Sequence, residues 1–212
     1  FAVRLLDLPG HGLSEGPRGH ISSMEHYQEV MHLWLTDQPR PLRLLGHSNG
    51  GAVLMEAMRS GLIGPGDKVV LLAPLLRWGW WRSTGALQAI FGWALGSLPR
   101  RFRDTTSDAS FAASRRADPL QIGRIPLSWT RAIRRWANIF EAQMNLPHAP
   151  IILQGRADKI VDWRANHLRI GRVFPKARFH FYKGARHHLQ GEASSIRKKV
   201  MAMVLETFEG DL

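Results

Sequence analysis

The sequence has no cysteine among its 212 residues. This absence excludes disulfide bonds, thiolate catalysis and zinc sites with cysteine ligands, and it leaves the redox compartment open. Long apolar runs are also missing, because no stretch of about eighteen apolar residues, the length that spans a membrane, occurs. No basic segment followed by an apolar one marks a secretory signal. We therefore expect a cytoplasmic protein without a transmembrane helix.

Histidine is abundant, with ten residues, but its spacing matches no metal-binding pattern. No His-x-x-x-His pair, which would place two rings on one helical face, is present. We therefore predict a protein without a metal site or another cofactor.

The net charge of +12 is distributed unevenly. Residues 1–76 carry 6 basic and 7 acidic side chains, residues 77–148 carry 11 and 4, and residues 149–212 carry 12 and 6, so the three parts have net charges of −1, +7 and +6. Such a positive field can attract nucleic acid, anionic membranes or acidic substrates. No helix-turn-helix, zinc-finger or RNA-binding sheet motif is present. We therefore exclude nucleic acid as a partner and keep peripheral contact with an anionic membrane as a candidate.

Short apolar runs predict strands, several of them too uniformly apolar for a sheet with one wet face. They lie at residues 2–6, 42–45, 68–73, 150–153 and 178–182. Phe1 already belongs to an apolar run, so we expect the chain to be a piece of a longer protein that begins inside or just before a strand.

Helical patterns lie between most of these strands. They cover residues 21–34 behind a Ser22-x-x-Glu25 capping box, 52–59 before Gly61, 165–173 and 196–208. Alternating strands and helices predict an α/β fold with a mainly parallel sheet that helices cover on both faces.

Residues 77–148 interrupt this alternation and contain no convincing strand. We therefore predict three parts: a first part of the core at residues 1–76, an inserted helical cap at 77–148, and a second part of the core at 149–212. The cap holds six of the eight tryptophans and eleven arginines, and an apolar helical stripe formed by Leu87, Ile90, Phe91, Ala94, Leu95 and Leu98. Such a stripe is either buried between cap and core or pressed against lipid. The tryptophans and arginines suit a boundary between acyl chains and anionic headgroups. Alternatively, the tryptophans fill the cap's own core and the arginines face solvent.

A possible nucleophile lies where an apolar run meets a helical pattern, in the sequence Gly46-His47-Ser48-Asn49-Gly50. A serine in a sharp strand-to-helix turn exposes its hydroxyl at the carboxyl edge of a parallel sheet, and glycines give the backbone room to bend. The pattern is therefore typical of a nucleophile elbow, with Gly46 and Gly50 as the flanking glycines. The alternative is a glycine-rich turn that packs a helix closely on the sheet.

A serine nucleophile needs a base and an acid that orients the base, and in this fold they follow it in the order acid, then histidine. Asp158 follows the run at 150–153, and His187 and His188 follow the run at 178–182. Asp158 could instead be a turn or capping residue, and Asp162 is a rival acid that better suits the N-cap of the next helix. The spacing does not distinguish His187 from His188.

Four motifs together resemble those of the α/β-hydrolase superfamily, and within it the monoacylglycerol lipase and bacterial lysophospholipase group, also called serine aminopeptidase-like hydrolases. They are DLPGHGLSEGPRG at 7–19, LLGHSNGGA at 44–52, ILQGRADKIV at 152–161 and GARHHLQGE at 184–192, and the ADPL at 117–120 is similar to the end of that group's cap. Asn49 stands where methionine is usual, and His188 where glutamate is more common.

The resemblance implies an α/β-hydrolase fold whose first strands lie before Phe1, together with one oxyanion-hole donor. It assigns the acid role to Asp158 and the base role to His187, and it leaves the Asn49 N–H as the oxyanion donor within this chain. It implies hydrolysis of carboxylic esters by Ser48, most simply of single-chain acyl lipids such as a lysophospholipid or a monoacylglycerol. An acyltransferase, an aminopeptidase and a non-catalytic protein that binds a membrane or a partner are the alternatives.

Overall fold

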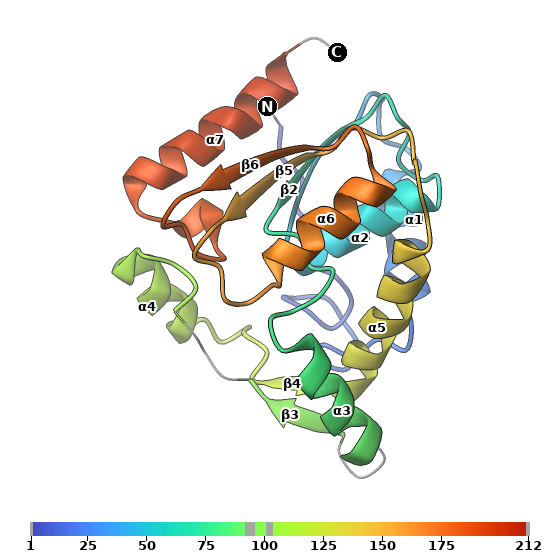
Figure 1. Cartoon of the computed structure of the whole chain (residues 1–212), viewed down its shortest axis with the longest axis vertical. Coiled ribbons are helices and arrows are strands. Elements are labelled where there is room, and N and C mark those ends of the chain that lie inside the picture. Colours follow the sequence, from blue (N-terminus) through green and yellow to red (C-terminus); the bar gives the residue numbers. More distant parts are fainter. Residues whose placement is uncertain (1, 92–95, 101–103, 211–212) are drawn as a thin grey trace.

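The central sheet has four parallel strands in the order β1-β2-β5-β6 (Figure 1). The computed structural model describes residues 2–91, 96–100 and 104–210. The strands are β1 (Arg43–His47), β2 (Lys68–Leu72), β5 (Ile151–Gly155) and β6 (Arg178–Tyr182). Four of the five predicted strands are thus confirmed, with ends that differ by at most two residues.

The two central strands are buried along their whole length because helices cover both faces of the sheet. Side chains alternate between two cores, as the two-residue period of a strand requires. Leu71 and Ile152 belong to the larger core with the helices on one face, whereas Leu72 and Leu153 pack with α7 on the other. In Figure 1, α7 lies on one side of the sheet and α2 and α6 lie on the other. The predicted α/β architecture is confirmed.

The predicted core helices are present as α1 (Glu25–Leu35), α2 (Asn49–Arg59), α6 (Trp163–Val173) and α7 (Ser194–Glu209). The predicted capping box at the start of α1 is wrong. Met24 occupies the N-cap and makes no side-chain cap bond. The Ser22 hydroxyl instead lies 3.0 Å from His26 Nδ1.

The predicted strand at residues 2–6 is not formed. A strand needs a neighbour that takes up its backbone hydrogen bonds, and no described strand pairs with these residues. Their side chains are correspondingly exposed, with Val3 at 76% and Leu5 at 91%. An apolar sequence alone was therefore not sufficient for a strand here.

The inserted segment, residues 77–148, contains α3 (Trp81–Phe91), α4 (Ala109–Ala117) and α5 (Leu127–Glu141). The expectation that it lacks strands is wrong, because β3 (Ser97–Pro99) pairs antiparallel with β4 (Arg124–Pro126). Each strand has three residues and includes a proline, so neither produces a recognisable strand pattern. α5 contributes Ile133, Trp136 and Phe140 to the larger core, whereas no residue of α4 is buried. The division of the chain at residues 76 and 148 stays a prediction.

The apolar stripe predicted around α3 lies only partly within the described residues. Ala94 and Leu95 fall outside them, as do the side chains of Leu87 and Phe91, while Ile90 is 62% exposed. The tryptophans of the inserted segment mostly face inward. Trp136 is buried, and Trp78, Trp81 and Trp129 pack against the larger core, whereas Trp80 is 39% exposed. Most of these rings therefore fill the interior.

We expect Gly155→Ala to destabilise the fold, because β5 ends where the loop after β6 crosses it closely. A Cβ at this position would lie 2.3 Å from Arg186 O and 2.4 Å from Ala185 O, and both atoms belong to the backbone. Overpacking of this kind costs about 1–3 kcal/mol or more, which urea unfolding can measure. Gly66→Ala is the control, because a Cβ there meets no atom within 4 Å. Equal stabilities of the two variants would contradict this expectation.

Candidate active site

Ser48 lies in a strained turn between β1 and α2. Its backbone has φ +52° and ψ −112°, a conformation that a residue with a side chain rarely adopts. A Cβ on Gly46 would lie 2.7 Å from Gly50 O, so position 46 requires glycine. The steric reason given for Gly50 does not hold, because a Cβ there meets nothing within 4 Å. The tight position is Gly51, whose Cβ would lie 3.0 Å from Pro74 Cα.

The structure brings together three of the side chains singled out from the sequence. His187 Nε2 lies 3.0 Å from Ser48 Oγ, and His187 Nδ1 lies 2.8 Å from Asp158 Oδ2. The His187 side chain is 5% exposed and that of Asp158 is 0% exposed. A hydroxyl, an imidazole and a carboxylate thus form one hydrogen-bonded chain in a largely water-free setting, which is the geometry of a serine nucleophile with its base and orienting acid.

The Asp158 carboxylate is held by the turn that follows β5. It accepts hydrogen bonds from Ile160 N at 2.7 Å, Val161 N at 3.2 Å and Gln154 Nε2 at 3.1 Å. Burial alone would raise the pKa of Asp158, but the hydrogen bond and charge of His187, together with the Ile160 and Gln154 donors, outweigh it and lower the pKa. The carboxylate therefore stays ionised beside the imidazole.

The rival acid and the rival base have other contacts. Asp162 is the N-cap of α6, where its carboxylate accepts from Ala165 N at 3.3 Å, as expected from the sequence. The His188 ring faces the inserted segment, where its Nε2 lies 2.5 Å from Arg115 Nη1. Burial lowers the pKa of His188. It is His187 that lies against Ser48, which the spacing alone had left open.

His47, which the sequence suggested only as a turn residue, packs between the two other histidines. Its ring centroid lies 4.8 Å from that of His187 and 4.6 Å from that of His188. Its Nε2 lies 3.1 Å from the carbonyl oxygen of His187, to which it can only donate, so Nε2 carries the proton. Burial of the ring, and then the charge of His187, lower the pKa of His47 to about 3. The neutral ring thus anchors the backbone of the proposed base.

Glu192 joins the loop of His187 to the inserted segment, a role that no sequence pattern indicated. Its carboxylate is fully buried and accepts from Arg186 N at 2.6 Å, from Ser107 N at 3.0 Å and from the Ser107 hydroxyl. His188 N also donates to Thr105 O at 2.8 Å. Since a buried charge needs such donors, the loop and residues 105–107 hold each other in place.

The Asn49 backbone N–H lies in the first turn of α2, where helix N–H groups have no partner within the helix. This fits the oxyanion role proposed for it. The Asn49 side chain turns elsewhere, because its Nδ2 donates to the Tyr27 hydroxyl at 3.4 Å.

Within the described part of the chain, no group of three or more histidine or acidic side chains is placed to hold a metal ion.

The low pKa of His47 predicts acid sensitivity of the fold. An unfolded histidine has a pKa near 6.5, whereas folding lowers the pKa of His47 to about 3. The unfolded chain therefore binds the proton more readily, so the stabilisation by neutral His47 is complete above about pH 6.5 and is lost as the pH falls toward about 3. In His47→Gln, whose amide can still donate to His187 O, we expect a smaller fall in the free energy of unfolding across this range.

Urea unfolding at several pH values measures this effect. His32→Gln, at an exposed position of α1, is the matched control and should keep the original pH dependence. If the His47 variant lost stability with acid as steeply as the unmodified protein, other groups would be responsible.

Solved structures of known proteins match most of the chain. A monoacylglycerol lipase from Paleococcus ferrophilus superposes with a TM-score of 0.77 at 21% identity over 94% of this chain and 80% of the other. A soluble variant of the Saccharomyces cerevisiae monoglyceride lipase, in complex with a substrate analogue, gives a TM-score of 0.76 at 18% identity over 96% and 76%. Both likenesses confirm the α/β-hydrolase fold.

A curated relative is phospholipase YtpA of Bacillus subtilis (strain 168), 42% identical over 60 residues. That match spans 26% of this chain and 23% of the phospholipase. The family model described as serine aminopeptidase, S33, matches residues 1–194, nearly the whole chain. The chain therefore belongs to the serine aminopeptidase S33 family.

Proposed function

We propose that this hydrolase cleaves carboxylic esters with Ser48 as nucleophile, His187 as general base and Asp158 as the orienting acid. The observation that carries the proposal is the hydrogen-bonded chain in which His187 lies 3.0 Å from Ser48 Oγ and 2.8 Å from Asp158 Oδ2. The strained backbone of Ser48 supports it, since such strain persists at functional sites where the surroundings enforce it.

The geometry supports the following reaction. Ser48 Oγ attacks the ester carbonyl carbon while His187 Nε2 takes the hydroxyl proton, and Asp158 stabilises the imidazolium. The Asn49 N–H donates to the oxyanion of the tetrahedral intermediate. His187 then returns the proton to the leaving alcohol, which gives an acyl-serine. Water, deprotonated by His187, attacks the acyl-serine. His187 then returns this proton to Ser48 Oγ as the ester bond breaks, which releases the acid and restores the hydroxyl.

We propose single-chain acyl lipids, such as a lysophospholipid or a monoacylglycerol, as the substrate class. The names of the phospholipase and of the two lipases support this class. The basic charge of the inserted segment is compatible with an anionic headgroup. An acyltransferase would use the same three side chains and differ only in what accepts the acyl group.

An aminopeptidase is less well supported, although the family model carries that name. Such an enzyme needs a free acidic group to bind the substrate's amine. The inserted segment has four acidic residues, and each is engaged in the described structure: Asp104, Asp108, Asp118 and Glu141. These four carboxylates already have partners, and eleven basic side chains in the same segment outnumber them.

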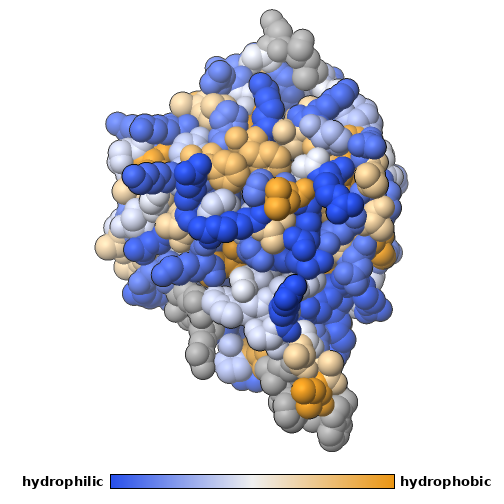
Figure 2. Space-filling model, viewed as in Figure 1, coloured by the Kyte–Doolittle hydropathy of each residue, from blue (hydrophilic) through white to orange (hydrophobic). Residues whose placement is uncertain are grey.

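Contact with an anionic membrane remains a proposal with mixed support. No helix within residues 2–91, 96–100 and 104–210 has both the length and the hydropathy that crossing a bilayer requires. Hydrophilic side chains cover much of the face in Figure 2, with apolar patches scattered between them. The inward packing of Trp78, Trp129 and Trp136 also removes rings that a lipid surface would need.

A fluorophosphonate probe distinguishes an enzyme from a binding protein on this fold. We expect covalent labelling of the full protein and its loss in Ser48→Ala, because only an activated serine attacks the probe. Ser60→Ala, at the other end of α2, is the matched control and should be labelled normally. Absence of labelling in the unmodified protein would favour the non-catalytic binder.

The two adjacent histidines provide a test of the base. We expect His187→Gln to lower kcat for aryl ester hydrolysis by about a hundred- to ten-thousandfold, the usual contribution of a positioned base. His188→Gln should stay within about tenfold of the unmodified enzyme, because its ring contacts Arg115 instead of the nucleophile. Far-UV circular dichroism checks that both variants fold. Equal losses of activity in the two folded variants would contradict the assignment.

A further inference from the structure

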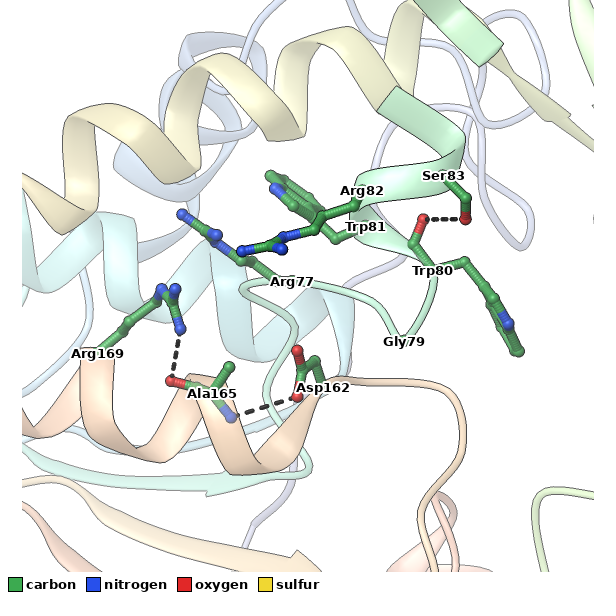
Figure 3. Close-up of a pocket in the computed structure, with 9 residues that line it drawn as sticks. All are labelled: Arg77, Gly79, Trp80, Trp81, Arg82, Ser83, Asp162, Ala165 and Arg169. Atoms are coloured by element: carbon green, nitrogen blue, oxygen red, sulfur yellow. Dashed lines mark hydrogen bonds between the residues drawn. The ribbon is translucent and has the colours of Figure 1, made fainter. Parts of the chain in front are cut away.

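A pocket lies outside the site of Ser48, between the start of α3 and the start of α6 (Figure 3). Its volume is about 430 Å³. None of the three residues of the proposed catalytic chain lines it. Its lining is formed by Arg77, Gly79, Trp80, Trp81, Arg82, Ser83, Asp162, Ala165 and Arg169.

The pocket is preformed, because backbone hydrogen bonds fix its wall to the turn that carries Asp158. Gly79 N donates to Ile160 O and Asp162 N donates to Arg77 O, both at 2.9 Å. Ile160 N in turn donates to the Asp158 carboxylate at 2.7 Å. The backbone of this wall is thus fixed to the turn after β5 by hydrogen bonds.

Three arginines line this pocket: Arg77 in the segment before α3, Arg82 in α3 and Arg169 in α6 (Figure 3). Arg77 forms a two-pronged pair with Glu141, at 2.7 and 2.6 Å, and Arg169 Nε lies 3.2 Å from the same carboxylate. Arg82 is exposed and makes no hydrogen bond or ion pair with any described residue. One cation at the pocket is therefore left without a counter-charge.

Positive charge exceeds negative charge around the pocket. Arg77, Arg82 and Arg169 face two carboxylates, those of Glu141 and Asp162, and Asp162 already caps α6. A further guanidinium, that of Arg134, lies 4.2 Å from the Trp81 ring centroid. Burial, and then the charge of Arg77, lower the pKa of Arg134, which is the direction that crowded cations impose.

We propose that this pocket binds a phosphoryl group. Guanidinium groups match phosphate oxygens with paired N–H donors and hold them more strongly than neutral donors do. A phosphoryl group offers at least three oxygens, whereas a carboxylate offers two. It can therefore accept from Arg82 and also from those N–H groups of Arg77 and Arg169 that are not bonded to Glu141. The half-buried indole of Trp81 gives the attached organic group an apolar surface to lie on.

The phosphoryl group can come from a free phosphate ester or from a lipid headgroup. Binding of a free phosphate ester would be independent of the chemistry at Ser48. The second rests on the proposed function, because the same lipid would then be the substrate of Ser48.

Direct binding tests the site independently of catalysis. Calorimetry with Ser48→Ala protein, which cannot turn over an ester, should show binding of glycerol 3-phosphate and none of glycerol. Arg82→Gln should weaken this binding about tenfold or more, as expected for a lost charge-assisted bond. Arg164→Gln is the matched control: it removes the same charge one residue before Ala165, but its guanidinium lies over Trp163 and outside the pocket. Equal weakening by both variants, or no binding, overturns the proposal.

Kinetics then distinguish the two sources. With an otherwise unmodified enzyme, Arg82→Gln should raise the KM for lysophosphatidic acid about tenfold, but not for a monoacylglycerol with the same acyl chain, if the headgroup is the ligand. If Arg82→Gln loses glycerol 3-phosphate binding but keeps the KM values for both lipids constant, the ligand is a free phosphate ester. If the enzyme hydrolyses neither lipid, the proposed function fails and the calorimetry still decides the pocket.

Discussion

The structure depends on one constraint, that its four parallel strands all end at the same edge of the sheet. His47 pairs with Leu72, Leu72 with Leu153 and Gly155 with Tyr182, so β1, β2, β5 and β6 finish almost level with one another. Each segment that follows a strand therefore starts beside the next one. This is how side chains separated by more than a hundred residues along the chain come within hydrogen-bonding distance of one another.

Close backbone approach at this edge sets the positions of the functional groups. Gly46 lets α2 turn back against β1, and Gly155 lets the loop of His187 cross the end of β5. The approach leaves carboxylates without water, and each is supplied with donors instead. Asp158 receives two backbone N–H groups and a side-chain amide, and Glu192 receives N–H groups from two segments. The hydrogen bonds to these buried carboxylates fix the loops relative to one another. Hydrogen bonds depend on direction, whereas apolar contacts do not.

Much of this architecture could be predicted from the sequence because its signals are local. The uniformly apolar runs of β2 and β5 indicate strands with both faces covered. The glycines around Ser48 indicate a strand-to-helix turn because an apolar run precedes them and a helical pattern follows them. Two strand predictions were wrong because they depend on pairing between distant segments. Residues 2–6 look like a strand, but no strand among the described residues pairs with them, and the β3–β4 pair is too short to leave a pattern. Pairing between distant segments decides both cases, and composition does not encode it.

The same limit applies to the candidate site. Spacing placed an acid after β5 and a histidine after β6, but it could not choose between His187 and His188, because adjacent residues differ only in where the backbone directs them. In the structure the carbonyl of His187 is bonded by His47, and the backbone N–H of His188 is bonded by Thr105. These two contacts orient the pair so that one ring meets Ser48 and the other meets Arg115. Thr105 comes from the inserted segment, so no reading of the histidine loop alone could have found this.

The turn after β5 serves two sites with different parts of the same residues. The side chain of Asp158 and the N–H groups of Ile160 and Val161 hold the carboxylate toward His187. The carbonyl of Ile160 and the N–H of Asp162 form hydrogen bonds with Gly79 and Arg77, which line the pocket proposed to bind a phosphoryl group. Because Asp158 fixes the turn whether or not that pocket is filled, a ligand there gains a rigid wall without having to move the carboxylate. Binding at the pocket would then add affinity for a ligand while leaving the chemistry at Ser48 unchanged, which is the division expected when binding and bond cleavage use separate groups.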